Sequence, residues 1–277
     1  MHRGQRPWVL RCESCGYLAS TLTARIGEAS HKGLREDRRA EALRPLRQHN
    51  FERVLEQLRL ARAPRGAHLL EVGCAHGWFL DAAQARGYAV EGIEPDVSMA
   101  GSATARSHIV TRGFFPADVR PGKTFEVIVF NDVFEHLPDP AAALDACRDR
   151  LHERGLLVLN LPSSRGIFFR LAAALDRMGV KQPYQRMWQF GFPSPHLSYF
   201  SPATIDALAA RHGFERVYAG KLASFDVHGL WSRLRYGGTS PALVSALTWL
   251  AIVAATPVFR LGPADIALHI YRLGEKR

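Results

Sequence analysis

A short turn at residues 71–79, EVGCAHGWF, carries the first chemical signal in this sequence. It follows an apolar run and precedes a helical pattern. Its small residues are Gly73, Ala75 and Gly77. Such residues let a backbone approach a ligand closely, and a helix that begins there offers free N–H groups. Glu94 ends the next apolar run, where a carboxylate can accept both ribose hydroxyls of a nucleoside. Together the two features predict a site for a nucleoside cofactor.

Apolar runs alternate with helical patterns around this turn. Five runs indicate strands, at residues 68–73, 88–94, 108–111, 125–131 and 156–161. Helical patterns separate them, at 78–86, after the candidate N-cap Asp96, and at 140–153. Because strands alternate with helices of about 10–15 residues, the pattern predicts parallel βαβ units with helices on both faces of a sheet.

The second half of the chain is less regular. Residues 163–200 contain aromatic residues, glycines and prolines without a clear period. A helix is predicted at 202–213, and strands are predicted at 214–220 and 265–273. No internal repeat or low-complexity tract is present.

The spacing of the small residues selects the kind of cofactor. A dinucleotide fingerprint reads G-x-G-x-x-G, which this turn does not contain. The motif E-x-G-C-x-x-G at 71–77 instead resembles the first motif of class I S-adenosylmethionine-dependent methyltransferases. Residues 125–140, FEVIVFNDVFEHLPDP, resemble the fourth-strand motif of that superfamily. Segments 196–214 and 262–273 resemble later parts of one small-molecule branch, so the resemblance covers about residues 40–273.

This resemblance implies an α/β fold. The expected architecture is a Rossmann-like, doubly wound sheet of seven mostly parallel strands, with helices on both faces and an antiparallel last strand. It implies S-adenosylmethionine as the cofactor, held by residues assigned by position: Glu71, Gly73, Cys74, Ala75, Gly77, Glu94, Pro95, Asn131 and Asp132. Glu71 is placed at the methionine end, Glu94 at the ribose and Pro95 beside the adenine. The third-strand region lacks a clear Gly-Asp pair, which leaves open whether Asp118 accepts a hydrogen bond from the adenine.

Two histidines are the candidate catalytic bases. A sulfonium methyl group is already electrophilic, so catalysis needs positioning and removal of the acceptor's proton. Histidine is the usual side chain for that task at neutral pH. His136 lies just after the fourth predicted strand, and His196 lies in the irregular segment. A structural role in a loop stays open for both, and Glu135 is expected to hold the loop in place.

Cys12 and Cys15 form a lone C-x-x-C motif. A structural zinc site needs four ligands, and the other cysteines, Cys74 and Cys147, belong to the cofactor turn and to a helix. The segment 11–16 resembles the second half of a zinc ribbon found ahead of some methyltransferases of this branch, with the first cysteine pair missing. No metal site is therefore predicted.

The composition is that of a globular protein with an uneven charge. The chain has 277 residues, of which 47% are hydrophobic and 22% charged, which excludes wholesale disorder, and only four cysteines, which excludes a disulfide scaffold. The net charge is +10, and most of the excess of Lys and Arg lies between Met1 and Arg65. Because acids and bases interleave there, a solvated helical face is expected rather than a surface for nucleic acid.

The predicted organisation is a methyltransferase domain at 39–277, preceded by a basic N-terminal arm at 1–38 that holds the C-x-x-C. Insertions on the substrate side are expected at about 163–200 and 221–262. The predicted acceptor is a small molecule methylated on a hydroxyl oxygen, such as a sugar, a quinol or a lipid-linked intermediate. The alternatives are an RNA or protein methyltransferase, a nucleic-acid-binding protein that uses the basic arm, and a nicotinamide-dependent oxidoreductase. The oligomeric state is left open.

An uncharged stretch runs from Ala242 to Phe259, and its length is at the lower limit for a membrane span. The strand predicted after it must return to the sheet, so a helix lying in the core or at a lipid surface is expected instead. The start of the chain is basic without an apolar segment, which favours the cytoplasm. Peripheral contact with a membrane is compatible with both observations.

Overall fold

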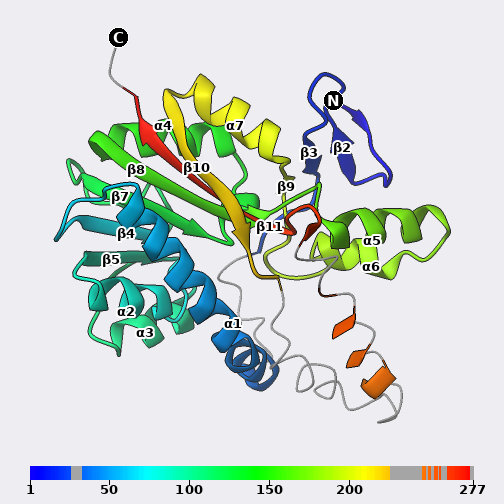
Figure 1. Ribbon diagram of the computed structural model, residues 1–277, viewed down its shortest axis with the longest axis horizontal. Helices are drawn as coiled ribbons and strands as arrows, with labels where there is room; N and C mark the ends of the chain where they lie inside the picture. Colours follow the sequence, from blue (N-terminus) through cyan, green and yellow to red (C-terminus); the bar gives the residue numbers. More distant parts are fainter. Residues whose placement is uncertain are drawn as a thin grey trace.

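The computed structural model describes residues 1–25, 33–224 and 261–274, with short pieces between 245 and 256. A seven-stranded sheet forms its centre, in the order β10-β11-β8-β7-β4-β5-β6 (Figure 1). The strands are β4 (His68–Val72), β5 (Ala89–Glu94), β6 (Ile109–Arg112), β7 (Phe125–Asn131), β8 (Leu151–Pro162), β10 (Phe214–Leu222) and β11 (Ile266–Leu273). Among these strands only β11 runs against its neighbours, β8 and β10. The predicted mostly parallel sheet with an antiparallel last strand is confirmed.

Helices cover both faces of this sheet, as predicted (Figure 1). The helices α1 (Gly33–Leu60) and α2 (Trp78–Ala85) pack on one face, where Leu55 and Phe79 join a core with Val127. On the other face, α4 (Pro140–Arg150) and α7 (Pro202–Arg211) bury Leu144 and Ile205. The helix α3 (Val97–Thr104) lies against β5 and β6. Strands buried on both faces explain the continuous apolar runs.

Polar caps set where several helices begin. Asp96 accepts hydrogen bonds from two backbone N–H groups at the start of α3, as expected for an N-cap. Asp139 does the same for α4, and Ser201 forms a capping box with Thr204 in α7. The expected helix over 140–153 was too long: α4 ends at Arg150, because Leu151 is buried and pairs with β7 as the first residue of β8.

A second, four-stranded sheet was not predicted. Its strands are β1 (His2–Arg3), β2 (Val9–Arg11) and β3 (Leu18–Ser20), completed by β9 (Ser198–Tyr199). The basic N-terminal arm expected over 1–38 therefore starts as a small sheet that takes its last strand from the predicted insertion at 163–200. Strands of two or three residues are too short to show the alternation of apolar and polar side chains that identifies a strand. They could therefore not be predicted from the sequence.

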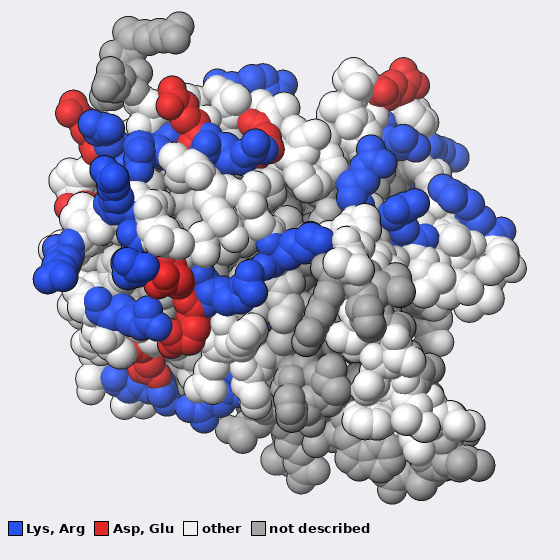
Figure 2. All heavy atoms as spheres, viewed as in Figure 1, with Lys and Arg blue, Asp and Glu red and all other residues white. Residues whose placement is uncertain are grey.

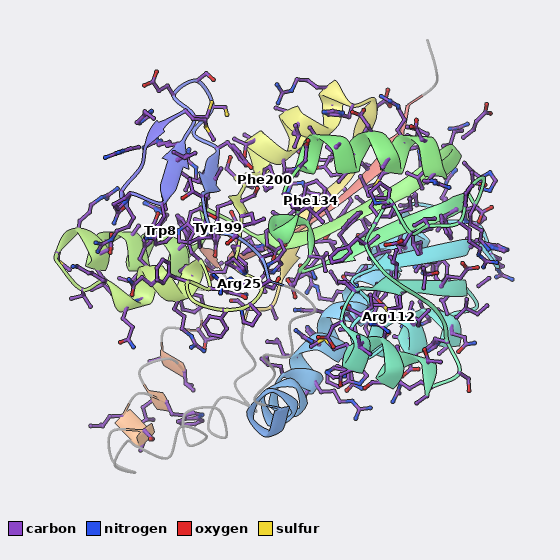
Figure 3. All side chains as sticks on the ribbon, turned by 180° about the vertical axis from the view of Figure 1, so that it is seen from behind. Trp8, Arg25, Arg112, Phe134, Tyr199 and Phe200 are labelled. Atoms are coloured by element: carbon purple, nitrogen blue, oxygen red, sulfur yellow. The ribbon has the colours of Figure 1, made fainter. Side chains whose placement is uncertain are left out.

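The insertion also contains two helices where no period was recognised, α5 (Ile167–Arg177) and α6 (Gln182–Met187). They meet the small sheet through an aromatic cluster that includes Trp8, Trp188 and Tyr199. Figure 3 shows Trp8 and Tyr199 in this contact, and Phe134 and Phe200 between the small sheet and the central one. The N-terminal residues and the insertion thus form one packed unit beside the central sheet.

The uncharged stretch at 242–259 lies largely outside the described residues. Within the part of the chain that the structure describes, no helix has the length and apolar character needed to span a membrane. On the face shown in Figure 2, acidic and basic side chains alternate over the central-sheet domain, whereas Lys and Arg predominate over the small sheet and α5.

Candidate active site

The turn between β4 and α2 adopts an unusual backbone conformation. Gly73, Ala75 and Gly77 all have positive φ, at 70°, 45° and 75°. A glycine takes this conformation freely, whereas for alanine it costs roughly 1–2 kcal/mol. A Cβ added to Gly73 would lie 2.5 Å from a methyl group of Val133. The turn therefore needs glycine at position 73 because it packs against the segment that follows β7.

Glu94 holds this turn from the end of β5. Its carboxylate accepts hydrogen bonds from the N–H groups of Ala75 and Asp96, each over 2.9 Å. Burial raises the pKa of Glu94, and the two N–H groups act against that shift. The carboxylate thus stabilises the left-handed conformation of Ala75, and each oxygen keeps a lone pair for a further donor.

Glu71 and Asn131 meet at the carboxyl ends of β4 and β7. The Asn131 amide donates to Glu71 Oε1 over 2.9 Å. The remaining atoms, Glu71 Oε2 and Asn131 Oδ1, are buried and have no hydrogen-bond partner among the described residues. Desolvation raises the pKa of Glu71 to about 8. Once Glu71 releases its proton, it and Asn131 offer two unpaired acceptors at the glycine turn, which fit the ammonium group of a ligand such as S-adenosylmethionine.

Arg47 of α1 contributes a positive charge to this site, and the sequence did not identify it. Its charge lowers the pKa values of Glu71 and Asp132 against the effect of burial. The charge pattern of α1 gave no signal, because basic residues occur along its whole length. A positive charge that acts on this edge of the sheet suits the carboxylate of an amino-acid ligand.

The remaining cofactor candidates surround the turn. Cys74 is buried over Gly92 of β5, and burial raises the pKa of its thiol. Pro95 is half-buried between Glu94 and the start of α3. Asp118 is exposed and accepts a hydrogen bond from the N–H of Phe114 over 2.7 Å, so the structure gives it a local role in its loop.

The chain after β7 leads from the cofactor side to the two candidate bases. Asp132 has a φ of 53°, and its N–H donates to the Asn160 carbonyl over 2.9 Å. A short 3-10 helix, η1 (Phe134–His136), follows. Its backbone meets the insertion, since the N–H of Leu197 donates to the Glu135 carbonyl over 2.8 Å.

His136 and His196 lie far apart in the sequence, and the structure brings their rings to a centroid distance of 4.7 Å. Glu135 lies beside both, with Oε1 at 4.0 Å from His136 Nε2 and 3.9 Å from His196 Nε2. Burial lowers the pKa of His136, and lowers that of His196 to about 3. Both imidazoles are therefore neutral near pH 7. Burial raises the pKa of Glu135 well above its ordinary value.

Residues 38–219 match a family model described as a methyltransferase domain. A ubiquinone biosynthesis O-methyltransferase from Azotobacter vinelandii is 36% identical over 125 residues, which cover 40% of this chain and 50% of that protein. The chain spans about half the length of the curated relatives it matches.

Solved structures show the same fold at low identity. A SAM-dependent methyltransferase from Archaeoglobus fulgidus superposes with a TM-score of 0.54 at 17% identity, covering 86% of this chain and 99% of that one. One from Mesorhizobium loti gives 0.52 at 15%, covering 78% and 96%. The family match covers most of the chain and includes the turn, β5 and β7. The chain therefore belongs to the methyltransferase-domain family, and the class I S-adenosylmethionine-dependent methyltransferase fold predicted from its motifs is confirmed.

Proposed function

We propose that this protein transfers the methyl group of S-adenosylmethionine to a hydroxyl oxygen of a small molecule, with a quinol ring as the first candidate. The observation that carries the proposal is the adjacency of two sites: the Glu71–Asn131 pair at the ends of β4 and β7, and the imidazole of His136, which ends the short helix η1 after β7 and meets the buried ring of His196. The names of the curated relatives, ubiquinone biosynthesis O-methyltransferases, support a quinol over a sugar or a lipid-linked intermediate.

On this proposal each end of the cofactor meets its own side chains. The unpaired acceptors of Glu71 and Asn131 take the ammonium group, and Arg47 faces the carboxylate. Glu94 accepts the ribose hydroxyls while it keeps its bonds to the turn. We assign the rest of the cofactor site to the residues around this edge, namely Gly73, Cys74, Ala75, Gly77, Pro95 and Asp132. When bound, the cofactor supplies an electrophilic methyl group on sulfur.

The side chains of the protein act on the acceptor rather than on the methyl group. Attack on the methyl group requires that the hydroxyl loses its proton or has it drawn away. His136 and His196 present unprotonated nitrogens for this purpose, because burial keeps both neutral near pH 7. His196 is buried, which strengthens its interaction with a polar acceptor group.

The test combines binding with transfer. Calorimetry with S-adenosylhomocysteine should give one site per chain. Labelled S-adenosylmethionine, offered with a catechol-type quinol precursor, a sugar and a short RNA, should label the quinol precursor on oxygen. Label that enters only the RNA or a protein would replace this proposal with a macromolecular methyltransferase, and the absence of any cofactor binding would remove it altogether.

A further inference from the structure

Three side chains of the kind that hold metal ions converge at the end of η1. One ligand atom from each of Glu135, His136 and His196 lies within 4.8 Å of the other two. The distances from Glu135 Oε1 to the two Nε2 atoms, 3.9 and 4.0 Å, are too long for hydrogen bonds. Glu135 therefore lies close to both imidazoles without a hydrogen bond to either.

The hydrogen bonds behind the rings fix which nitrogen carries the proton. His136 Nδ1 lies 2.9 Å from the carbonyl oxygen of Pro195, so Nδ1 donates. His196 Nδ1 lies 3.2 Å from the Tyr199 hydroxyl, which already donates its proton to the Met187 carbonyl, so this Nδ1 also donates. Both neutral rings then keep an unprotonated Nε2 near Glu135, at 4.0 Å for His136 and 3.9 Å for His196, and that of His196 accepts a hydrogen bond from the Gln189 amide. Metal-bound histidines are oriented in this way, with the outer N–H on a carbonyl or similar acceptor.

The carboxylate has no cation to balance it in the described part of the chain. The Glu135 side chain is 2% exposed, its Oε2 has no hydrogen-bond partner, and no Lys or Arg of the described residues lies within ion-pair distance. A buried carboxylate without a partner is unfavourable, and a bound cation would supply one.

We infer that Glu135, His136 and His196 bind a divalent transition-metal cation of the Zn²⁺ or Mn²⁺ class. Two imidazoles and one carboxylate form a three-ligand set that leaves a coordination position open. Ligand atoms around a tetrahedral zinc ion lie about 3.3 Å apart, given bonds of about 2.0–2.2 Å. The two separations between Glu135 and the imidazoles must therefore shorten by about 0.6–0.7 Å, and the Gln189 amide, now 2.9 Å from His196 Nε2, must turn away.

The role of the ion rests on the proposed function. A hydroxyl of the acceptor takes the open position, and the ion lowers its pKa so that its proton leaves to bulk water. The oxygen lone pair then forms the new C–O bond, and the electron pair of the breaking S–C bond stays on sulfur, giving S-adenosylhomocysteine. In the metal-loaded protein the imidazoles are therefore ligands, and bulk water takes the proton that they would accept in the metal-free protein.

The experiment must exclude the thiols of Cys12 and Cys15, which could bind the same ions. A Cys12→Ser, Cys15→Ser double variant, freed of metal with a chelator, is titrated with Zn²⁺ and with Mn²⁺ by calorimetry. One equivalent should bind. The added changes Glu135→Gln and His196→Gln should each weaken binding at least tenfold. His212→Gln is the matched control, since this imidazole bonds Asp145 away from the cluster and its loss should leave binding unchanged.

Binding of S-adenosylhomocysteine is measured on every variant as a readout of folding. A Glu135→Gln protein that keeps cofactor binding and loses metal binding supports the site. A parent protein that takes up no ion, or a Glu135→Gln variant that binds it unchanged, overturns the site even where methyl transfer is observed. If instead metal binds but no hydroxyl acceptor is methylated, the proposed function fails and the metal site stands.

Discussion

The Ser20 hydroxyl donates a hydrogen bond to the backbone carbonyl of His196 over 2.9 Å, although the two residues are distant in the sequence. The N–H of Ser20 also donates to the next carbonyl, that of Leu197, over 2.8 Å. Strand β3 of the small sheet thus fixes the backbone that carries His196. The N-terminal residues are part of the framework of the candidate active site.

Removing that hydroxyl should slow methyl transfer without disturbing the cofactor. A Ser20→Ala change loses one hydrogen bond, worth about 1 kcal/mol, and frees the carbonyl of His196 to shift. We expect turnover to fall several-fold while the affinity for S-adenosylhomocysteine stays constant. Ser102→Ala is the control, because its hydroxyl bonds only its own helix α3. Equal turnover in both variants would show that β3 does not position His196.

Glu94 should control cofactor affinity in two ways. It accepts the N–H groups of Ala75 and Asp96 and, on our proposal, the ribose hydroxyls. A Glu94→Gln variant loses charge-assisted bonds worth about 1.5–3 kcal/mol, so calorimetry should show affinity for S-adenosylhomocysteine reduced about tenfold or more. Glu91→Gln, on the same strand but paired with Lys123, is the control. Unchanged affinity in the Glu94 variant would place the ribose elsewhere.

Glu71 should make the stability of the cofactor-free protein depend on pH. Desolvation raises its pKa from 4.5 to about 8, so the folded protein keeps a proton that the unfolded chain releases. The free energy of unfolding should therefore fall as pH rises from about 4.5 to about 8.

Glu71→Gln is neutral at every pH and should lack this slope. The variant should be more stable than the parent at pH 8, by an amount on the order of a few kcal/mol, with the difference vanishing near pH 4. Urea unfolding at several pH values measures it, with the exposed Glu153→Gln as the control. Parallel curves for parent and Glu71→Gln would contradict the raised pKa.

A buried ion pair between Arg6 and Asp176 joins the small sheet to α5, and its loss should lower the free energy of unfolding. Arg6 donates to both carboxylate oxygens of Asp176, and Gln5 donates to the same group over 2.6 Å. Asp176→Ala leaves the Arg6 guanidinium half-enclosed without its partner, so unfolding should cost about 1–3 kcal/mol less. Proteolysis near residue 25 should become faster in this variant. The exposed Asp149→Ala should change neither quantity.

Local signals made the cofactor edge predictable from sequence. Three features predicted this edge: the small residues of the turn, Glu94 at the end of its strand, and the apolar run before Asn131. Each depends on residues that are close together in the chain, so the sequence pattern shows it directly. The packing reason for Gly73 was not visible, because Val133, which it meets, belongs to a segment much further along the chain.

Features that depend on contacts between residues far apart in the sequence could not be predicted from it. The small sheet has strands of two or three residues and takes β9 from residues 198–199. Arg47 carries the same charge as many neighbours, and only the fold shows that its charge acts on Glu71. His136 and His196 were both identified, but their meeting with Glu135 depends on the path of the insertion.

The fourth strand of the small sheet has a consequence for synthesis of the protein. Strand β9 leaves the ribosome about 180 residues after β1 to β3, which is roughly 10–40 s at usual elongation rates. During that interval one edge of β3 and the aromatic side chain of Trp8 lack the partners they have in the finished protein. Strands β1 to β3 therefore reach their final structure long after they are made, and the open edge of β3 is exposed to other nascent chains in the meantime.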